Sequence, residues 1–182
     1  AAPSPEEREE WLRKVRQRGL ALAYAPDVYK DDKALVLEAV KENGRALYYA
    51  AKVCKSDSEL VLAAVRQDGY ALSDAADSCK SDQDIVLAAV KQNGSVLSYA
   101  AASCRSDREI VHAAVKQSWQ ALMYASDVLL DDSSFAMEVR RRFRLLKVSM
   151  LSGKHTICAF TEDEEDGRSA EAVLQKCCYR LR

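Results

Sequence analysis

A 25-residue period dominates this sequence and restricts the folds open to it. The string Val-Leu-Glu-Ala-Val-Lys-Glu-Asn-Gly begins at Val36 and recurs with few changes. Its copies begin at Trp11 (a degenerate one), Val36, Val61, Val86 and Val111, and the pattern dissolves at Ala136. Self-similarity at a fixed spacing is the signature of a stacked repeat architecture. We therefore expect about five tandem units, each built in the same way.

Each unit is predicted to form two short helices. The segments at 56–59, 81–84 and 106–109 resemble capping boxes. In such a box the serine side chain accepts a hydrogen bond from a backbone N–H, and the acid three residues on accepts one from the backbone N–H of the serine. The glycines at 19, 44, 69 and 94 are expected to end the first helix in a left-handed conformation. The second helix is predicted to follow at once, with an apolar stripe that runs from Ala46 to Cys54 in one copy.

One such helix pair cannot bury its own apolar side, so neighbouring units must cover it. The sequence thus predicts a mostly α-helical solenoid of helical hairpins over residues 1–144. Ser4-Pro5-Glu6-Glu7 is a strong helix start, with a capping serine and a proline in the first turn. Lys14 stands where later copies have a buried-type alanine, which is typical of a terminal unit that faces water.

Residues 145–182 follow a different pattern. Leu146, Val148 and Met150 alternate with polar residues and predict a strand, and residues 155–161 predict a second strand of a hairpin. An acidic loop at 161–167 and a final helix are expected to complete this smaller unit.

Two resemblances follow from these patterns. The string Asp-Asp-x-x-Leu-Val-Leu-x-Ala-Val-x-x-Asn-Gly-x-Ala-Leu-x-Tyr-Ala, over roughly residues 10–135, resembles a tandem repeat family catalogued only as a domain of unknown function. That resemblance implies helical repeats and brings no catalytic residue with it. The order of elements after residue 145 is similar to the opening half of a ubiquitin-like β-grasp module.

Composition excludes several classes of function. Lys and Arg number 27 against 28 Asp and Glu, so net charge gives no overall attraction to nucleic acid or acidic membranes. No apolar run approaches the roughly 20 residues that a membrane span requires. The chain begins with Ala1, which suggests a processed protein or one that lacks its natural start. We expect a reducing intracellular compartment, either the cytoplasm or an organelle interior after removal of a targeting peptide.

The cysteines are predicted to be structural. Cys54, Cys79 and Cys104 share a repeat position with Tyr29 and Leu129, which indicates a core position. Copies about 10 Å apart, the spacing of stacked helices, are too distant to share a metal ion or a disulfide. The adjacent Cys177 and Cys178 lack the spacing of zinc or redox sites.

No catalytic constellation is recognisable, so we expect no enzyme activity, no metal and no cofactor. His112 replaces the leucine of other copies, and His155 lies at the predicted turn, and neither has a partner for a triad. A basic cluster could contact phosphate, but a solvated helix face is the preferred interpretation. The cluster consists of Arg140, Arg141, Arg142, Arg144 and Lys147.

Substitutions within the repeat are the better functional clues. Asp74 interrupts a ladder of tyrosines at one repeat position, and Trp119 replaces a glycine. Arg45, Tyr48 and Tyr70 are residue types enriched at protein interfaces. These five residues are the candidate partner-binding positions, against the alternative of drift on a free surface.

The leading hypothesis is a non-catalytic module for protein–protein interaction or assembly. One alternative is a structural accessory subunit of a large complex, whose hairpin edge a neighbour would complete. Another is nucleic-acid binding through Arg140 to Lys147, which the balanced net charge disfavours.

Overall fold

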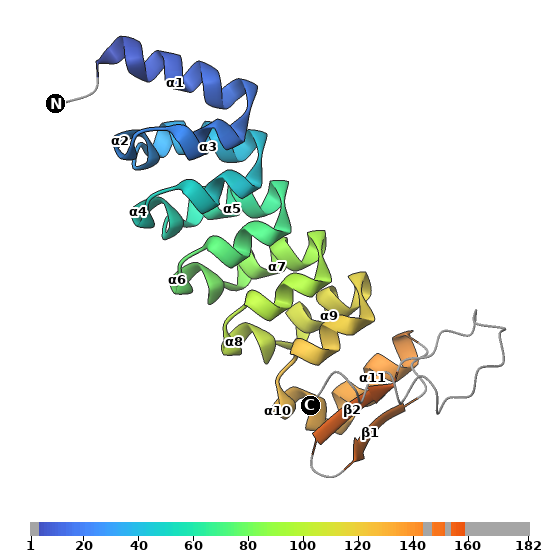
Figure 1. The fold of residues 1–182 in the computed structure, drawn as a ribbon. Helices are drawn as coiled ribbons and strands as arrows, with labels where there is room; N and C mark the ends of the chain where they lie inside the picture. Colours follow the sequence, from blue (N-terminus) through green and yellow to red (C-terminus); the bar gives the residue numbers. More distant parts are fainter. Residues whose placement is uncertain (1–3, 144–146, 152–153, 159–182) are drawn as a thin grey trace.

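The structure, a computed structural model, describes residues 4–143, 147–151 and 154–158. The chain forms a rod in which five repeats succeed one another from the N-terminal helix toward a hairpin at the other end (Figure 1). Each repeat contains a long α-helix, a 3-10 helix and a short α-helix, in that order. The predicted mostly helical repeat architecture is therefore confirmed.

The three kinds of element have these bounds. The long helices are α1 (Pro5–Gln17), α3 (Lys33–Glu42), α5 (Ser58–Gln67), α7 (Gln83–Gln92), α9 (Arg108–Gln117) and α11 (Ser133–Phe143). The 3-10 helices are η1 (Gly19–Tyr24), η2 (Gly44–Tyr49), η3 (Gly69–Asp74), η4 (Gly94–Tyr99) and η5 (Trp119–Tyr124). The short helices are α2 (Asp27–Lys30), α4 (Lys52–Lys55), α6 (Asp77–Lys80), α8 (Ala102–Arg105) and α10 (Asp127–Asp131). Repeats 1 to 5 begin with α1, α3, α5, α7 and α9.

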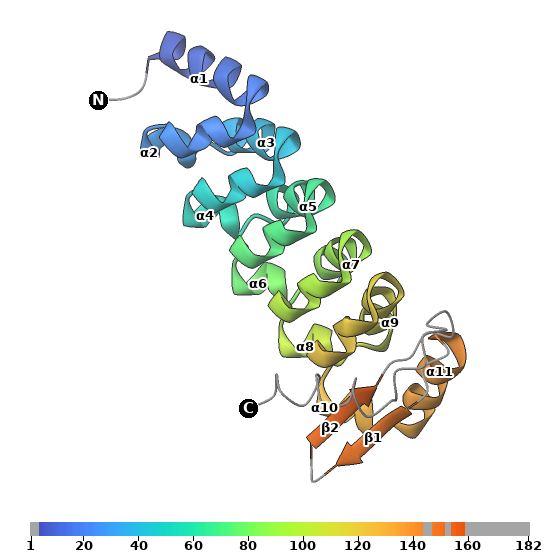
Figure 2. The same ribbon diagram turned by 45° about the vertical axis from the view of Figure 1, so that its right-hand side comes forward.

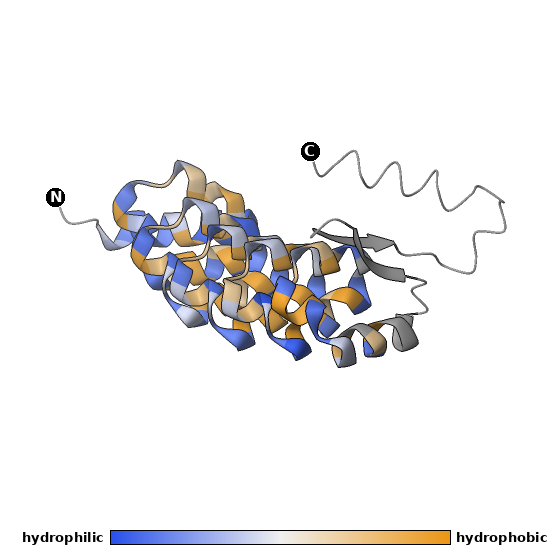
Figure 3. Cartoon of the chain, turned by 90° about the horizontal axis from the view of Figure 1, so that it is seen from below, coloured by the Kyte–Doolittle hydropathy of each residue, from blue (hydrophilic) through white to orange (hydrophobic). Residues whose placement is uncertain are grey.

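Elements of one kind stack on their counterparts in the next repeat. The long helices α1 to α9 form one layer and the 3-10 helices form a second layer against them. The short helices follow one another along one edge of the rod, on the left in Figures 1 and 2. Apolar residues run through the interior along the length of the rod (Figure 3). The repeat positions of Leu47, Leu72 and Leu97 are fully buried there.

The predicted second helix of each unit is in fact two pieces. In repeat 2, Ala50 and Ala51 have extended backbones that separate η2 from α4. This break frees the Ala51 N–H, which donates to the Lys30 carbonyl of the preceding repeat at 2.9 Å. The same bond joins Ala76 to Lys55, Ala101 to Lys80 and Ser126 to Arg105, each at 2.9 Å. The prediction of a simple helical hairpin was therefore wrong in detail, because hydrogen bonds between repeats override the helical preference of the local sequence.

The predicted role of the glycines was also wrong. None of Gly19, Gly44, Gly69 and Gly94 has a left-handed backbone, and each begins a 3-10 helix. A Cβ built on Gly94 would lie 2.2 Å from the Ala114 carbonyl oxygen in the following repeat. Glycine is therefore required because the backbones of successive repeats approach closely.

The residues that cap the long helices also differ from the prediction. Asp57, and not Ser56, caps α5 by accepting from the N–H groups of Glu59 and Leu60. Asp32, Asp82, Asp107 and Asp132 do the same for their helices. At the N-terminus, the predicted capping box of Ser4 and Glu7 is confirmed. Lys14 is exposed, as expected of a terminal unit, whereas its equivalents from Ala39 onward are fully buried.

Beyond α11, β1 (Lys147–Leu151) and β2 (Lys154–Cys158) pair antiparallel. The predicted acidic loop and final helix lie outside the described residues. The separate C-terminal unit and its likeness to a β-grasp module therefore stay predictions.

Candidate protein-binding surface

Exposed apolar side chains are distributed unequally between the two layers. In the described part of the chain, the large ones lie on 3-10 or short helices, with Met137 of α11 as the exception. They are Tyr24, Tyr48, Tyr49, Tyr70, Tyr99, Met123 and Tyr124 on the 3-10 helices, and Val28, Val53 and Val128 on the short helices. We call the exposed side chains of η1 to η5 the 3-10 band. Because the 3-10 helices lie side by side, these residues form a surface that extends along the rod.

The geometry of the 3-10 helix explains which residues the band contains. With three residues per turn, side chains at i and i+3 lie in line. In η2 this aligns Arg45 with Tyr48, while Ala46 and Leu47 face the core and are fully buried. Tyr49 follows at the end of the helix and is 37% exposed. Repeat 2 therefore presents Arg45, Tyr48 and Tyr49 to solvent.

Repeat 2 concentrates aromatic and cationic groups in this band and on the adjoining helix α4. Tyr48 is 61% exposed, and its ring meets that of Tyr49 edge-on with centroids 5.0 Å apart. The Lys55 ammonium lies 5.4 Å from the centroid of the Tyr48 ring and donates to the Tyr48 carbonyl at 2.7 Å. Lys55 thus fixes the local backbone and contributes a cation–π contact.

Arg45 connects repeat 2 to repeat 3. Its Nε donates to Asp68 Oδ2 at 2.7 Å, and its guanidinium lies 5.9 Å from the centroid of the Tyr70 ring. Asp68 also accepts from the Tyr70 N–H, as the cap of η3. This link holds Arg45 and Tyr70 side by side across two repeats.

Asp74 occupies the repeat position of Tyr49 in the next repeat. Burial raises the pKa of its carboxyl, and the nearby Lys55 and Lys80 act in the opposite direction. The acid is therefore close enough to lysines of two repeats to feel their charge, at a position where other repeats have a tyrosine. It moderates the positive charge at the centre of the band.

The candidate residues fall into two groups. Arg45, Tyr48, Tyr70 and Asp74 come together on η2 and η3. Trp119 begins η5, remote from them along the rod, and only its backbone is described. Sequence reasoning missed Lys55, although its recurrence as Lys30, Lys80 and Arg105 was a visible signal.

The basic cluster is only partly described. Arg140, Arg141 and Arg142 lie in α11 and Lys147 in β1, without described side chains, and Arg144 lies outside the described residues. The preference for a solvated face over phosphate binding thus stays a prediction.

The interpretation of the repeated cysteines as core residues is confirmed. Cys54, Cys79 and Cys104 are buried free thiols, and burial raises the pKa of each. Tyr29 and Leu129 are buried at the same repeat position. A thiol with a raised pKa in an apolar site is a poor nucleophile. Across the described residues, no three His, Cys, Asp or Glu side chains could hold a metal ion together.

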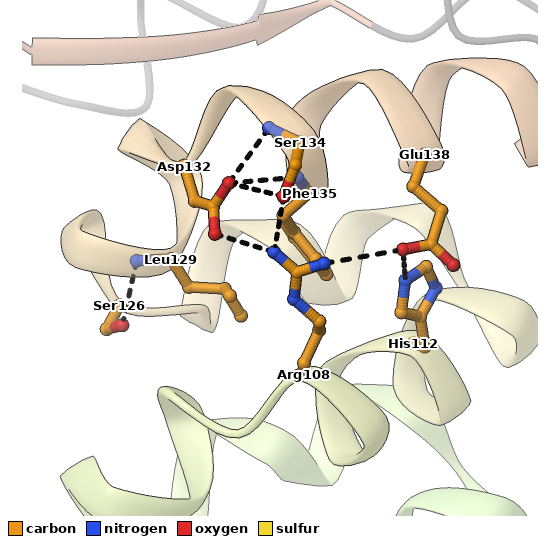
Figure 4. Close-up of polar contacts among 8 residues, drawn as sticks. All are labelled: Arg108, His112, Ser126, Leu129, Asp132, Ser134, Phe135 and Glu138. Carbon is orange, nitrogen blue, oxygen red and sulfur yellow. Dashed lines mark hydrogen bonds and ion pairs between the residues drawn. The ribbon is translucent and has the colours of Figure 1, made fainter.

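His112 belongs to the junction between α9 and α11. Its Nε2 lies 3.3 Å from Glu138 Oε2, and its ring meets that of Phe135 edge-on at 5.0 Å (Figure 4). Arg108 reaches Asp132 at 2.6 Å and the Ser134 hydroxyl at 2.7 Å in the same place. The side chain of His112 is 14% exposed, so it packs as a partly buried contact residue.

Comparisons with known proteins agree with the repeat architecture. No curated protein and no solved structure matches the chain. None of the described helices is both long and apolar enough to cross a membrane. A family model matches two tandem segments, residues 8–52 and 57–103, which together make up just over half of the sequence. The chain therefore belongs to the family described as domain of unknown function DUF4116.

Proposed function

We propose that this protein is a non-catalytic binding module whose 3-10 band holds a protein partner. The observation that carries the proposal is the unequal distribution of exposed apolar side chains. Tyr48 at 61%, Tyr70 at 40% and Tyr99 at 41% exposure lie on the 3-10 layer, while the exposed positions of the long helices α3, α5, α7 and α9 are polar or alanine. Aromatic residues and arginine are the types that contribute most to protein interfaces.

The rigidity of the band supports the same function. Its backbone is held by the bond of each repeat to the next, such as Ala76 N–H to Lys55 O at 2.9 Å. Side chains such as Arg45 and Tyr48 are further fixed by the contacts described above. A surface that is ordered before binding loses less conformational entropy when a partner docks.

The test is capture of partners from the source cell with the native chain and two variants. Tyr48→Ala combined with Tyr70→Ala should remove specific partners, because both rings leave the band without disturbing the core. Lys91→Ala combined with Gln92→Ala is the matched control, since both residues are exposed on α7. Circular dichroism should be the same for all three proteins. Equal capture by the two variants would overturn the proposal.

The hairpin favours a second function, that of a structural subunit in a larger assembly. β1 and β2 form a two-stranded sheet, which is marginally stable in water by itself. A strand from a neighbouring protein could extend such a sheet. The chain expressed alone should then aggregate or melt at low temperature, and a monodisperse monomer with a high melting temperature would argue against this role.

Three buried thiols fit a reducing compartment.

A further inference from the structure

We propose that the partner binds at repeat 2, over the 3-10 band and the adjoining helix α4, and that it presents an acidic segment with an aromatic residue. This inference rests on the proposed function of the 3-10 band. The surface consists of Arg45, Tyr48, Tyr49, Lys52, Val53 and Lys55, which we call the repeat-2 patch. The partner chemistry follows from charge, preorganisation and apolar exposure at these six residues.

Charge distinguishes repeat 2 from the other repeats. Residues 44–55 contain Arg45, Lys52 and Lys55 and no acidic residue, which gives a formal charge of +3. The equivalent segments 19–30, 69–80, 94–105 and 119–130 have formal charges of 0, -1, +1 and -1. The net charge of the whole chain is -1, so this excess is local. A local cationic surface attracts acidic segments and disfavours basic ones.

Lys55 is held in place without losing its charge. Its ammonium is bound by the Tyr48 carbonyl at 2.7 Å, and a carbonyl carries no net charge. The equivalent Lys30 is bound instead by the carboxylate of Asp27 at 3.2 Å. A carboxylate from a partner therefore meets an oriented ammonium at Lys55, whereas at Lys30 it would have to displace Asp27.

Two acids of the chain oppose this binding and fix its position. Asp68 is paired with Arg45 at 2.7 Å, although the Arg45 side chain stays 65% exposed. Asp74 lies near Lys55 and Lys80, with a carboxyl pKa that burial raises. Because Asp68 already pairs with Arg45, the carboxylates of the partner segment are expected to approach over Lys52 and Lys55.

The exposed apolar side chains of the patch indicate that the partner segment is not purely acidic. Tyr48 and Val53 are 61% and 57% exposed and flank the lysines. A purely acidic peptide would leave them uncovered, whereas a segment with an aromatic side chain would bury them. The chain itself contains such a segment, Phe160 followed by Thr161 and then by five acids, residues 162–166.

The experiment uses a fluorescent peptide that copies residues 160–167 as the probe, titrated against the full-length chain. The probe should bind, and a version with Gln and Asn in place of its acids should bind at least about tenfold more weakly. Lys52→Ala combined with Lys55→Ala should weaken the probe to a similar degree. Asp74→Asn should strengthen it severalfold. Lys91→Ala combined with Lys116→Ala is the control, because it removes two exposed positive charges from the long-helix layer.

Equal binding of the acidic and neutral probes, or equal loss in the two lysine pairs, would overturn the inference. Lys55→Arg keeps the charge and should retain most of the binding, which separates charge from a folding defect. A further variant neutralises residues 162–166 in the chain. If this variant gains about tenfold in affinity for the probe, the patch is occupied by the protein's own acidic segment, which would overturn a partner protein as occupant.

The capture experiment separates this inference from the proposed function. Partners that are lost with Tyr48→Ala and Tyr70→Ala, but retained with Lys52→Ala and Lys55→Ala, would leave the binding function in place and remove the acidic chemistry. Partners retained by both pairs would remove the binding function as well.

Discussion

The junctions inside the rod are built differently from the junction at its C-terminal end. Gly94 lets the backbone of repeat 4 come against the Ala114 carbonyl of repeat 5. At the equivalent position of repeat 5 stands Trp119 in place of glycine. There, α11 is held by side chains, with Arg108 at Asp132 and Ser134 (Figure 4). Interior junctions thus combine a close backbone contact at glycine with ion pairs such as Arg8 with Asp32, whereas the last junction has the ion pair without the glycine.

Adding a methyl group to an interior glycine should lower the free energy of unfolding more than any other change considered below. Gly94→Ala places a Cβ 2.2 Å from Ala114 O, and backbone atoms cannot move aside as a flexible side chain can. We expect a loss of about 3 kcal/mol in the free energy of unfolding, measured by urea denaturation. Gly69→Ala should cost less, because its nearest atom lies at 2.8 Å. Ser95→Ala is the control. Equal stability of all three variants would show that the junctions accommodate an added methyl group without loss of packing.

Removing an interior helix cap should have the next largest effect. Asp82 accepts from the N–H groups of Asp84 and Ile85 at the start of α7. Asp82→Ala should lower the free energy of unfolding by about 1 kcal/mol, the usual value for a lost cap. Asp82→Asn retains the cap and should be close to the native protein in thermal melts. Similar losses in both variants would assign the effect to charge instead of the cap.

Acid should act preferentially on the last junction. Hydrogen bonds from the Ser134 hydroxyl and from the Phe135 and Ser134 N–H groups, together with Arg108, lower the pKa of Asp132 to about 2. Because the folded-state pKa lies below the unfolded one, this stabilisation is complete above about pH 4 and is lost as the pH falls toward about 2. Asp132→Asn should therefore show a smaller fall in melting temperature between these values than the native chain.

The control for this pH dependence is the pair of interior caps Asp32 and Asp57. Their carboxyl pKa values are also lowered, chiefly by Arg8 and Lys33, and they contribute equally to both proteins. Parallel acid profiles for the native chain and Asp132→Asn would contradict a special role of the last junction.

The smallest effect is expected from an exposed ion pair between interior repeats. Lys33 reaches Asp57 Oδ2 at 2.5 Å, and the lysine side chain is 58% exposed. Lys33→Ser copies the residue at the equivalent position in repeat 3, Ser58, which makes no such pair with Asp82 in the described structure. Solvent screens exposed pairs, so the thermal midpoint should not change measurably. A clear decrease would mean that the exposed ion pairs of the interior junctions contribute measurably to stability.

The sequence predicted those features that repeat at every copy. The core positions of Cys54 and Val61 follow from helical spacing and from what other copies place there. The exposure of Arg45, Tyr48 and Tyr70 follows from their variability in an otherwise regular unit. These inferences succeed because burial at one repeat position is nearly the same in each repeat.

What the sequence did not predict depends on contacts between repeats. The glycine rule that failed at Gly44 is a local rule for helix ends, whereas the real constraint is the Ala64 carbonyl, 20 residues away. The break at Ala50 and Ala51 is likewise set by a bond to Lys30 of the neighbouring repeat. The Lys55 contact with the Tyr48 carbonyl depends on that break, which is why the central lysine of the repeat-2 patch was missed.

The bonds from Ala51 to Lys30 and from Ala76 to Lys55 join residues that are 21 positions apart, as do their two successors. The entropy lost on closing each loop is therefore the same at every step and does not increase with the length of the array. Duplication of a 25-residue segment of the gene would add one more step with the contacts already present. The length of this rod is thus a quantity that evolution can change in whole units without designing a new junction.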